Sequence, residues 1–344
     1  MYSEENIMSD TLKILKKLVA PVSVSGREDA VRGVIAEEIA KYTDSVTVDA
    51  LGNLVAFIEG KGENKKKLMY AAHIDEIGFM VTYIEENGFI RFAQIGGINY
   101  ASAAFTQVVF ENGVRGVLVP ESGCAPADMK AEKCVVDIGV TSRKAAERYV
   151  SIGDTFAVQS DLKKLAGQRY CGRPLDDRVG AAVMIEAARR IREAGGARND
   201  LYLAFTTQEE VGLRGSKTAS YAITPDVGIA FDVTGTGDTP SAKPMAVSLG
   251  GGAAIKIKDA SVVCDRDLVE KMKKTAKDNE VKYQLEILTA GGTDTASIQQ
   301  AASGAIAGCI SIPTRYIHSS VETVDMNDVE ECVRLAHLMA DAEL

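Results

Sequence analysis

The chain has 344 residues, of which 46% are hydrophobic, and a formal net charge of −9. Single hydrophobic cores stop growing at roughly 250 to 300 residues, so two domains are expected rather than one. Nucleic acids and anionic membranes require clustered Lys and Arg, so the acidic balance argues against either as a partner.

The N-terminus predicts a cytoplasmic protein. It begins with acidic residues and then turns amphipathic, with Leu12, Leu15 and Val19 at helical spacing. A secretory signal would instead need a basic start and an apolar centre. No window approaches the ~20 apolar residues of a membrane span. The six cysteines are scattered without metal-binding spacing, so we expect them to be reduced.

Residues 1–77 are expected to form the first part of an α/β domain. A helix is predicted over residues 9–19. Ser25 is followed three residues later by Glu28, a capping box that predicts the start of a second helix running to about residue 42. Strand-like runs follow in SVTVDALGNLVAFIEG and in KKLMYAAHIDEIGFMV.

The sequence pattern changes in residues 78–166, which consist of short β-rich runs separated by turns. Two ENG turns between apolar runs predict hairpins. Only SRKAAERYV is typical of a helix. This stretch is therefore expected to be a small all-β barrel or sandwich inserted into the other domain.

Residues 167–344 return to alternating strands and helices. This alternation predicts a three-layer α/β domain with a largely parallel sheet. Ligands of such sheets bind at the carboxyl ends of the strands. Chemistry is therefore to be sought where the predicted strands end.

The chain has three histidines, and two of them lie where polar groups follow an apolar strand. His73 ends the run LMYAAH, and Asp75, two residues on, is a candidate carboxylate neighbour for its ring. His318 follows the strand 305–312. His337 lies at helical spacing among apolar residues, which favours packing rather than chemistry.

Three other strand ends carry acids: Asp176 and Asp177 in CGRPLDDRVG, Glu209 and Glu210 in TTQEEVG, and Asp232 in IAFDVTG. Adjacent carboxylates repel each other unless a cation or a shared proton compensates. Two histidines and several carboxylates at one sheet edge are a ligand set for two divalent metals, which need about three ligands each with one carboxylate bridging. One acid then remains as a general base.

At this point the sequence resembles a known family, the glutamyl, leucyl and deblocking metallo-aminopeptidases that assemble into tetrahedral shells. Some members of that family carry a cellulase label. The resemblance spans nearly the whole chain, in order and spacing. It rests on the segments LKKLVAPVSVSGRE, AAHIDEIGFMV, VDIGVTSRKAAE, GRPLDDRVG, TTQEEVGLRG, FDVTGTGD, GGTDTASIQ and PTRYIHSSVETVD.

The resemblance implies a role for each candidate residue. One metal would be bound by His73, Asp176 and Asp232, and the other by Asp176, Glu210 and His318, with Asp176 bridging. Glu209 would be the general base, and Asp75 the carboxylate behind His73. Zinc is expected, with cobalt or manganese as alternatives, because mixed His and carboxylate sites accept all three.

The resemblance also implies a PDZ-like dimerisation domain in residues 78–166 and dimers that build a dodecamer. The segment that follows GGI in this insert diverges from the family pattern. The substrates would be peptides with free N-termini. Which side chain is preferred at the first position depends on loops whose folding the sequence does not give.

The predicted function is hydrolysis of the N-terminal residue of peptides. In this hypothesis Glu209 accepts a proton from a water shared by the two metals. Three alternatives stay open: a metal-dependent deacylase of small amides, a catalytically silent metal-binding assembly protein, and a glycosidase. Adjacent glutamates with paired histidines suit metal binding better than the two flanking carboxylates of a glycosidase.

Overall fold

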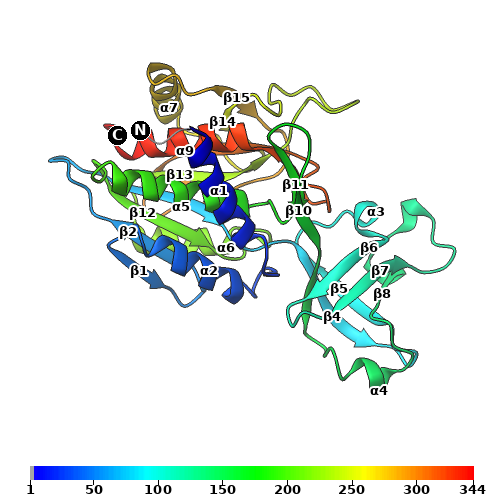
Figure 1. Cartoon of the computed structure of the whole chain (residues 1–344). Helices are drawn as coiled ribbons and strands as arrows, with labels where there is room; N and C mark the ends of the chain where they lie inside the picture. Colours follow the sequence, from blue (N-terminus) through cyan, green and yellow to red (C-terminus); the bar gives the residue numbers. More distant parts are fainter. Residues whose placement is uncertain (1–3) are drawn as a thin grey trace.

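In a computed structural model, which describes residues 4–344, the chain forms an α/β body and a closed β-barrel beside it (Figure 1). The body is built on an 11-stranded sheet, and the barrel closes with β4-β5-β8-β7-β6-β9. This architecture confirms the fold class expected from the sequence. The first three residues of the predicted N-terminal segment, residues 1–3, lie outside the described residues.

The helices and strands follow one another in three groups. Before the barrel come α1 (Glu4–Leu18), α2 (Asp29–Ile39), β1 (Ser45–Val48), β2 (Leu54–Ile58) and β3 (Lys67–His73). The barrel region holds β4 (Gly78–Ile84), β5 (Ile90–Ile95), α3 (Tyr100–Ala103), β6 (Thr106–Phe110), β7 (Arg115–Pro120), β8 (Cys134–Asp137), α4 (Arg143–Ala146) and β9 (Thr155–Val158). After it come β10 (Ser160–Lys164), β11 (Arg169–Arg173), α5 (Arg178–Glu193), β12 (Asp200–Thr206), α6 (Arg214–Ile223), β13 (Val227–Thr234), β14 (Ala253–Lys258), α7 (Arg266–Asp278), β15 (Tyr283–Ile287), α8 (Thr295–Gln299), β16 (Ile306–Arg315), β17 (Thr323–Asp325) and α9 (Met326–Ala340).

The large sheet is parallel at its centre and antiparallel at its edges. Its order is β1-β2-β12-β3-β13-β16-β17-β11-β10, and β14 pairs with both β15 and β16. The neighbours β12, β3, β13 and β16 run parallel to one another. Their carboxyl ends therefore meet at one edge, where β3 ends at His73 and its register partner on β12 is Thr206.

The two faces of the sheet carry different side chains because strand residues alternate in direction. On β3, Leu68, Tyr70 and Ala72 belong to the larger core, whereas Met69 and Ala71 belong to a smaller one. Helices α5 and α9 cover the face with the larger core, and α6 and α8 cover the other. This is the three-layer arrangement that the alternating sequence predicts.

The barrel has its own aromatic core. The ring centroid of Phe156 lies 5.0 Å from that of Phe79 and 4.8 Å from that of Phe110. Both hairpins expected from the ENG turns are present, as the antiparallel pairs β4–β5 and β6–β7. The dimerisation role and the exact limits of the inserted domain stay predictions.

Two details differ from the expectations. Helix α2 begins at Asp29, and Ser25 does not cap it, because the Ser25 hydroxyl donates to Asp75 instead. The barrel region contains the short helix α3 and two 3-10 turns, at Pro126–Asp128 and Ala131–Lys133, besides the expected helix at α4. None of the helices in residues 4–344 combines the length and the apolar character needed to cross a membrane.

Phe156→Ala is expected to destabilise the protein by about 3–5 kcal/mol, because a fully buried ring is replaced by a cavity. The free energy of unfolding from urea denaturation is the measurement. The matched control is Phe105→Ala, since the Phe105 side chain is 75% exposed, and we expect it to change stability by less than about 0.5 kcal/mol. Equal effects of the two variants would contradict the assignment of the barrel core.

Candidate active site

A cavity of about 430 Å³ lies at the carboxyl ends of the central strands. Seven residues are expected to bind metal, to act as the general base or to support His73, and six of them line this cavity. They are His73, Asp176, Glu209, Glu210, Asp232 and His318. Asp75 is fully buried next to the cavity.

His73 is the last residue of β3 and is buried, with 2% exposure. Its Nε2 lies 3.0 Å from Asp176 Oδ1 and 3.9 Å from Asp232 Oδ1. Its Nδ1 lies 3.1 Å from the backbone oxygen of Asp75. When Nδ1 carries the hydrogen and donates to that oxygen, Nε2 presents its lone pair to the space between the two carboxylates.

His318 reaches the other side of Asp176. It lies in the loop between β16 and β17, and its Nε2 is 3.2 Å from Asp176 Oδ2 and 3.1 Å from Glu210 Oε1. The two oxygens of Asp176 therefore face two different histidines. This arrangement would allow Asp176 to bridge two cation sites.

The donor atoms fall into two groups that fit divalent metals. His73, Asp176 and Asp232 form one group and Asp176, Glu210 and His318 the other, and within each group ligand atoms lie within 4.8 Å of one another. Each group offers one imidazole and two carboxylates, which suits zinc or a neighbouring transition metal. Glu209 lines the same cavity but belongs to neither group.

The site buries more carboxyl groups than its histidines can balance. Burial raises the pKa of Asp232 and of Glu209 well above the usual carboxyl range, and neighbouring carboxylates raise each further. Burial disfavours charge on His73, but its hydrogen bonds with Asp176 and Asp75 outweigh burial and hold its pKa well above the usual value. Bound cations would favour ionised carboxylates and neutral imidazoles, so this excess is what a metal site requires.

Asp75 holds the two glutamates as well as lying beside His73. Its carboxylate accepts hydrogen bonds from the backbone N–H of Glu209 at 3.0 Å and of Glu210 at 3.2 Å, and from the Ser25 hydroxyl at 2.6 Å. The ring Nδ1 of His73 is 3.5 Å from Asp75 Oδ1, farther than from the backbone oxygen of the same residue. Asp75 therefore links His73 to the turn that carries the adjacent acids.

Sequence reasoning did not single out Glu322, which is 1% exposed. One of its oxygens accepts from the backbone N–H of His318 at 3.0 Å. The other accepts from Leu175 at 2.6 Å and from Asp176 at 3.1 Å. Glu322 thus positions the backbone of two candidate ligands. The only signal in the sequence is an acid four residues after His318.

The barrel also touches the site through the GGI segment. A Cβ atom on Gly97 would lie 3.4 Å from Nδ1 of His318, and one on Gly96 would lie 2.5 Å from a methyl carbon of Ile77. Gly96 has φ of +77°, a conformation that glycine adopts without strain. The insert therefore packs directly against the loop that holds His318.

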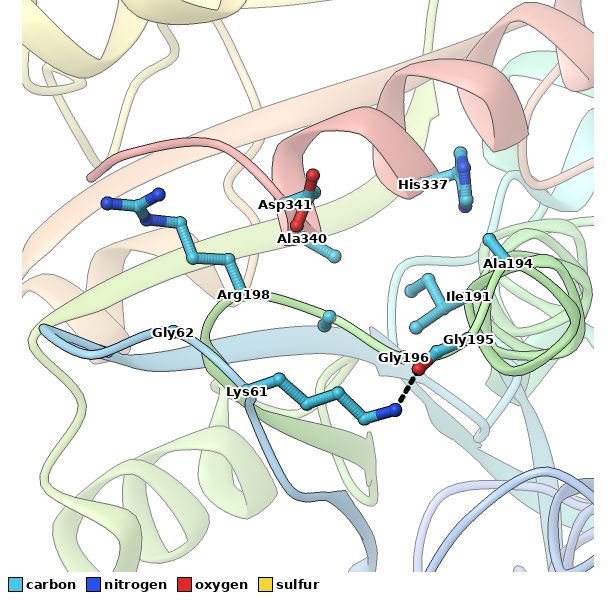
Figure 2. Close-up of a pocket in the computed structure, with 11 residues that line it drawn as sticks. Lys61, Gly62, Ile191, Ala194, Gly195, Gly196, Arg198, His337, Ala340 and Asp341 are labelled. Carbon is cyan, nitrogen blue, oxygen red and sulfur yellow. Dashed lines mark hydrogen bonds between the residues drawn. The ribbon is translucent and has the colours of Figure 1, made fainter.

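A second cavity, of about 370 Å³, lies elsewhere on the body (Figure 2). His337 lines it together with Lys61 and Arg198, and the Lys61 ammonium donates to the carbonyl of Gly195. Lys61 precedes β3 and Arg198 precedes β12, so this cavity is at the amino ends of the strands. His337, which lines this cavity, therefore lies away from the candidate metal ligands at the carboxyl ends of the strands.

Glu322→Gln is expected to weaken zinc binding by about 10- to 100-fold, because an amide group replaces one acceptor of the backbone N–H groups. Competition with a chelating dye measures the affinity. Glu343→Gln, at a side chain that is 83% exposed, is the control and should bind zinc like the unmodified protein. A folded Glu322→Gln variant with unchanged zinc affinity would show that Glu322 does not position the ligands.

The sequence is similar to curated proteins over nearly its full length. It is 46% identical over 327 residues to a protein of Acetivibrio thermocellus, covering 95% of this chain and 97% of that one. It is 33% identical over 342 residues to the lysyl aminopeptidase of Pyrococcus furiosus, covering 96% of each.

Solved structures share the fold. An aminopeptidase of the archaeon Desulfurococcus kamchatkensis matches with a TM-score of 0.93 at 33% identity, over 98% of this chain and 96% of that one. The TET1 peptidase of Pyrococcus horikoshii, described as assembling into a tetrahedron or a large octahedral shell, matches with a TM-score of 0.86 at 32% identity, over 97% and 100%. A structure from Thermotoga maritima described as an endoglucanase matches with a TM-score of 0.80 at 32% identity, over 95% and 96%.

The family model of the M42 glutamyl aminopeptidases matches residues 52–335, which include every candidate site residue. The match covers most of the α/β body and the whole barrel. The chain therefore belongs to the M42 glutamyl aminopeptidase family.

Proposed function

We propose that the protein is a two-metal aminopeptidase that removes the N-terminal residue of peptides. The observation that carries this proposal is the position of Asp176. Its two carboxylate oxygens lie 3.0 and 3.2 Å from the Nε2 atoms of two histidines, each of which has a further carboxylate beside it. One carboxylate between two His-and-acid groups supports two metal sites that share a ligand.

Glu209 is the proposed general base. It is the carboxylate of the cavity that neither candidate metal group uses. Its neighbour Glu210 is committed to His318, at 3.1 Å. Asp75 fixes the backbone of both glutamates, so the two adjacent acids can serve different roles.

Divalent ions at this site would lower the pKa of a shared water and polarise the scissile carbonyl. Glu209 accepts a proton from the water that attacks this carbonyl. Glu209 then donates the proton to the nitrogen of the departing peptide, which restores its carboxylate. Burial raises the pKa of the Glu209 carboxyl above its usual range, and a raised pKa makes a carboxylate a stronger proton acceptor.

Zinc is the proposed metal, with cobalt and manganese as alternatives that the same donors accept. Self-association is the second part of the proposal. The TET1 relative is described as forming closed shells, and the barrel of this chain lies to one side of the body (Figure 1). We propose that the barrel is the dimerisation domain and that dimers build a dodecamer.

A glycosidase is the second candidate, because one structural relative is described as an endoglucanase. Glycosidases place two carboxylates on opposite sides of the scissile bond, roughly 5 to 9.5 Å apart, and most need no metal. Here the acids alternate with two histidines in two compact groups. This arrangement favours the aminopeptidase. A metal-dependent deacylase or a silent metal-binding protein would share the groups but not the turnover of free N-termini.

Glu209→Gln is expected to lower kcat by at least about 100- to 10,000-fold, because the amide does not accept the proton. The bound zinc per chain should stay at the wild-type value, since Glu209 is outside both metal groups. Hydrolysis of aminoacyl-anilides and elemental analysis are the two measurements. Substantial activity in this variant would make the base assignment wrong.

Chelation is expected to abolish hydrolysis of peptides with free N-termini, and zinc, cobalt or manganese should restore it. An N-acetylated peptide and soluble cellulose serve as comparison substrates in the same assay. Turnover of the blocked peptide would favour a deacylase. Turnover of cellulose by the metal-stripped protein would favour a glycosidase and contradict the two-metal proposal.

A further inference from the structure

One wall of the cavity that contains the candidate metal ligands is made of uncharged residues. Apart from the six site residues, it is lined by Leu213, Val233, Thr234, Gly235, Ser261, Leu288, Gly291, Gly292 and Ile317. Within residues 4–344, no lysine or arginine lines it. An acidic side chain placed there would therefore find no cation of this chain outside the metal site.

The apolar part of this wall comes from three separate segments. Leu288 follows β15, Ile317 follows β16, and Leu213 immediately precedes α6. All three side chains are partly buried, so each has apolar surface available to a ligand. Covering such surface with an aliphatic group is favourable, whereas covering it with a charged group is costly.

The two hydroxyls of the wall are already engaged. Thr234 donates to Glu286 at 2.9 Å, and Ser261 donates to Asp259 at 2.8 Å. Both donor hydrogens are therefore directed at acids of this chain. The hydroxyl groups can accept from a ligand but have no hydrogen left for a carboxylate.

Lys256, which is fully buried, is the cation beside the two acids behind these hydroxyls. Its ammonium contacts Glu286 and lies 3.5 Å from Asp259. Asp259 also accepts from the backbone N–H of Ser261 and of Val262, at 2.8 and 2.9 Å. Both acids are buried and share this one ammonium, so behind the wall a lysyl side chain would find no exposed carboxylate.

We propose that this wall, with Leu288 and Ile317 as its main contacts, selects an uncharged aliphatic side chain at the first position of the peptide. The inference rests on the proposed function, since a free N-terminus at the metals places the first side chain in this cavity. The preferred first side chain of this chain would then differ from the lysyl preference in the name of the P. furiosus relative. It would also differ from the glutamyl activity that the family description names.

The test is kcat/KM of the zinc-loaded enzyme for leucyl-, methionyl-, glutamyl-, lysyl- and arginyl-anilides. We expect the leucyl or methionyl substrate to exceed each charged one by at least about tenfold, since differential burial of one aliphatic side chain has an effect of this order. A charged substrate that is hydrolysed fastest would overturn the inference and leave aminopeptidase activity in place.

Two variants test the wall itself. Leu288→Asp is expected to raise the lysyl-to-leucyl ratio of kcat/KM by at least about tenfold, because it adds an unpaired carboxylate to the cavity. Ile287→Asp is the matched control, at a neighbouring side chain that is 53% exposed and does not line the cavity, and should leave the ratio unchanged. An unchanged ratio in folded Leu288→Asp would show that Leu288 does not contact the first side chain.

A binding measurement separates this inference from the proposed function. Free leucine, glutamate and lysine are titrated calorimetrically into zinc-loaded Glu209→Gln. If the unmodified zinc-loaded enzyme hydrolyses no anilide, the proposed function is wrong. Tighter binding of leucine to the variant would still support an uncharged aliphatic pocket. Tighter binding of glutamate or lysine would overturn it.

Discussion

The placement of one buried carboxylate between two imidazoles is the interaction on which the site depends. Asp176 has 7% exposure and meets His73 with one oxygen and His318 with the other. Without cations, this cluster would bury more carboxylates than its histidines can balance. A buried excess of one charge is costly, so the fold is best understood as a frame that holds these ligands for metal.

That frame is assembled from segments far apart in the chain. The parallel strands β3 and β13 deliver His73 and Asp232 to one edge of the sheet, as the topology requires. Two fully buried acids then tie the loops together through backbone N–H groups. Asp75 holds the turn of Glu209 and Glu210, and Glu322 holds the backbones of Asp176 and His318. Ligand positions are therefore fixed by hydrogen bonds as well as by strand register.

Much of this could be predicted from the sequence because the signals are local. The apolar run that ends in His73 marks the end of β3, and the run to Asp232 marks β13, which continues to Thr234. The alternation of strands and helices marks the fold class. The partners of Ser25 and Glu322 could not be predicted, because they are distant in the sequence. Ser25 bonds to Asp75, 50 positions away, and Glu322 bonds to Leu175, 147 positions away. The same limit applies to the wall of the cavity, which joins Leu213, Leu288 and Ile317 only after folding. Local patterns identify ligands, whereas the contacts that orient them are tertiary.

The most direct test of the central claim is the location of bound metal by anomalous diffraction at the zinc edge, from crystals grown with zinc. We expect two peaks, one beside His73 and Asp232 and one beside His318 and Glu210, with an oxygen of Asp176 bound to each. A single peak, or two peaks that do not share Asp176, would contradict the two-metal site.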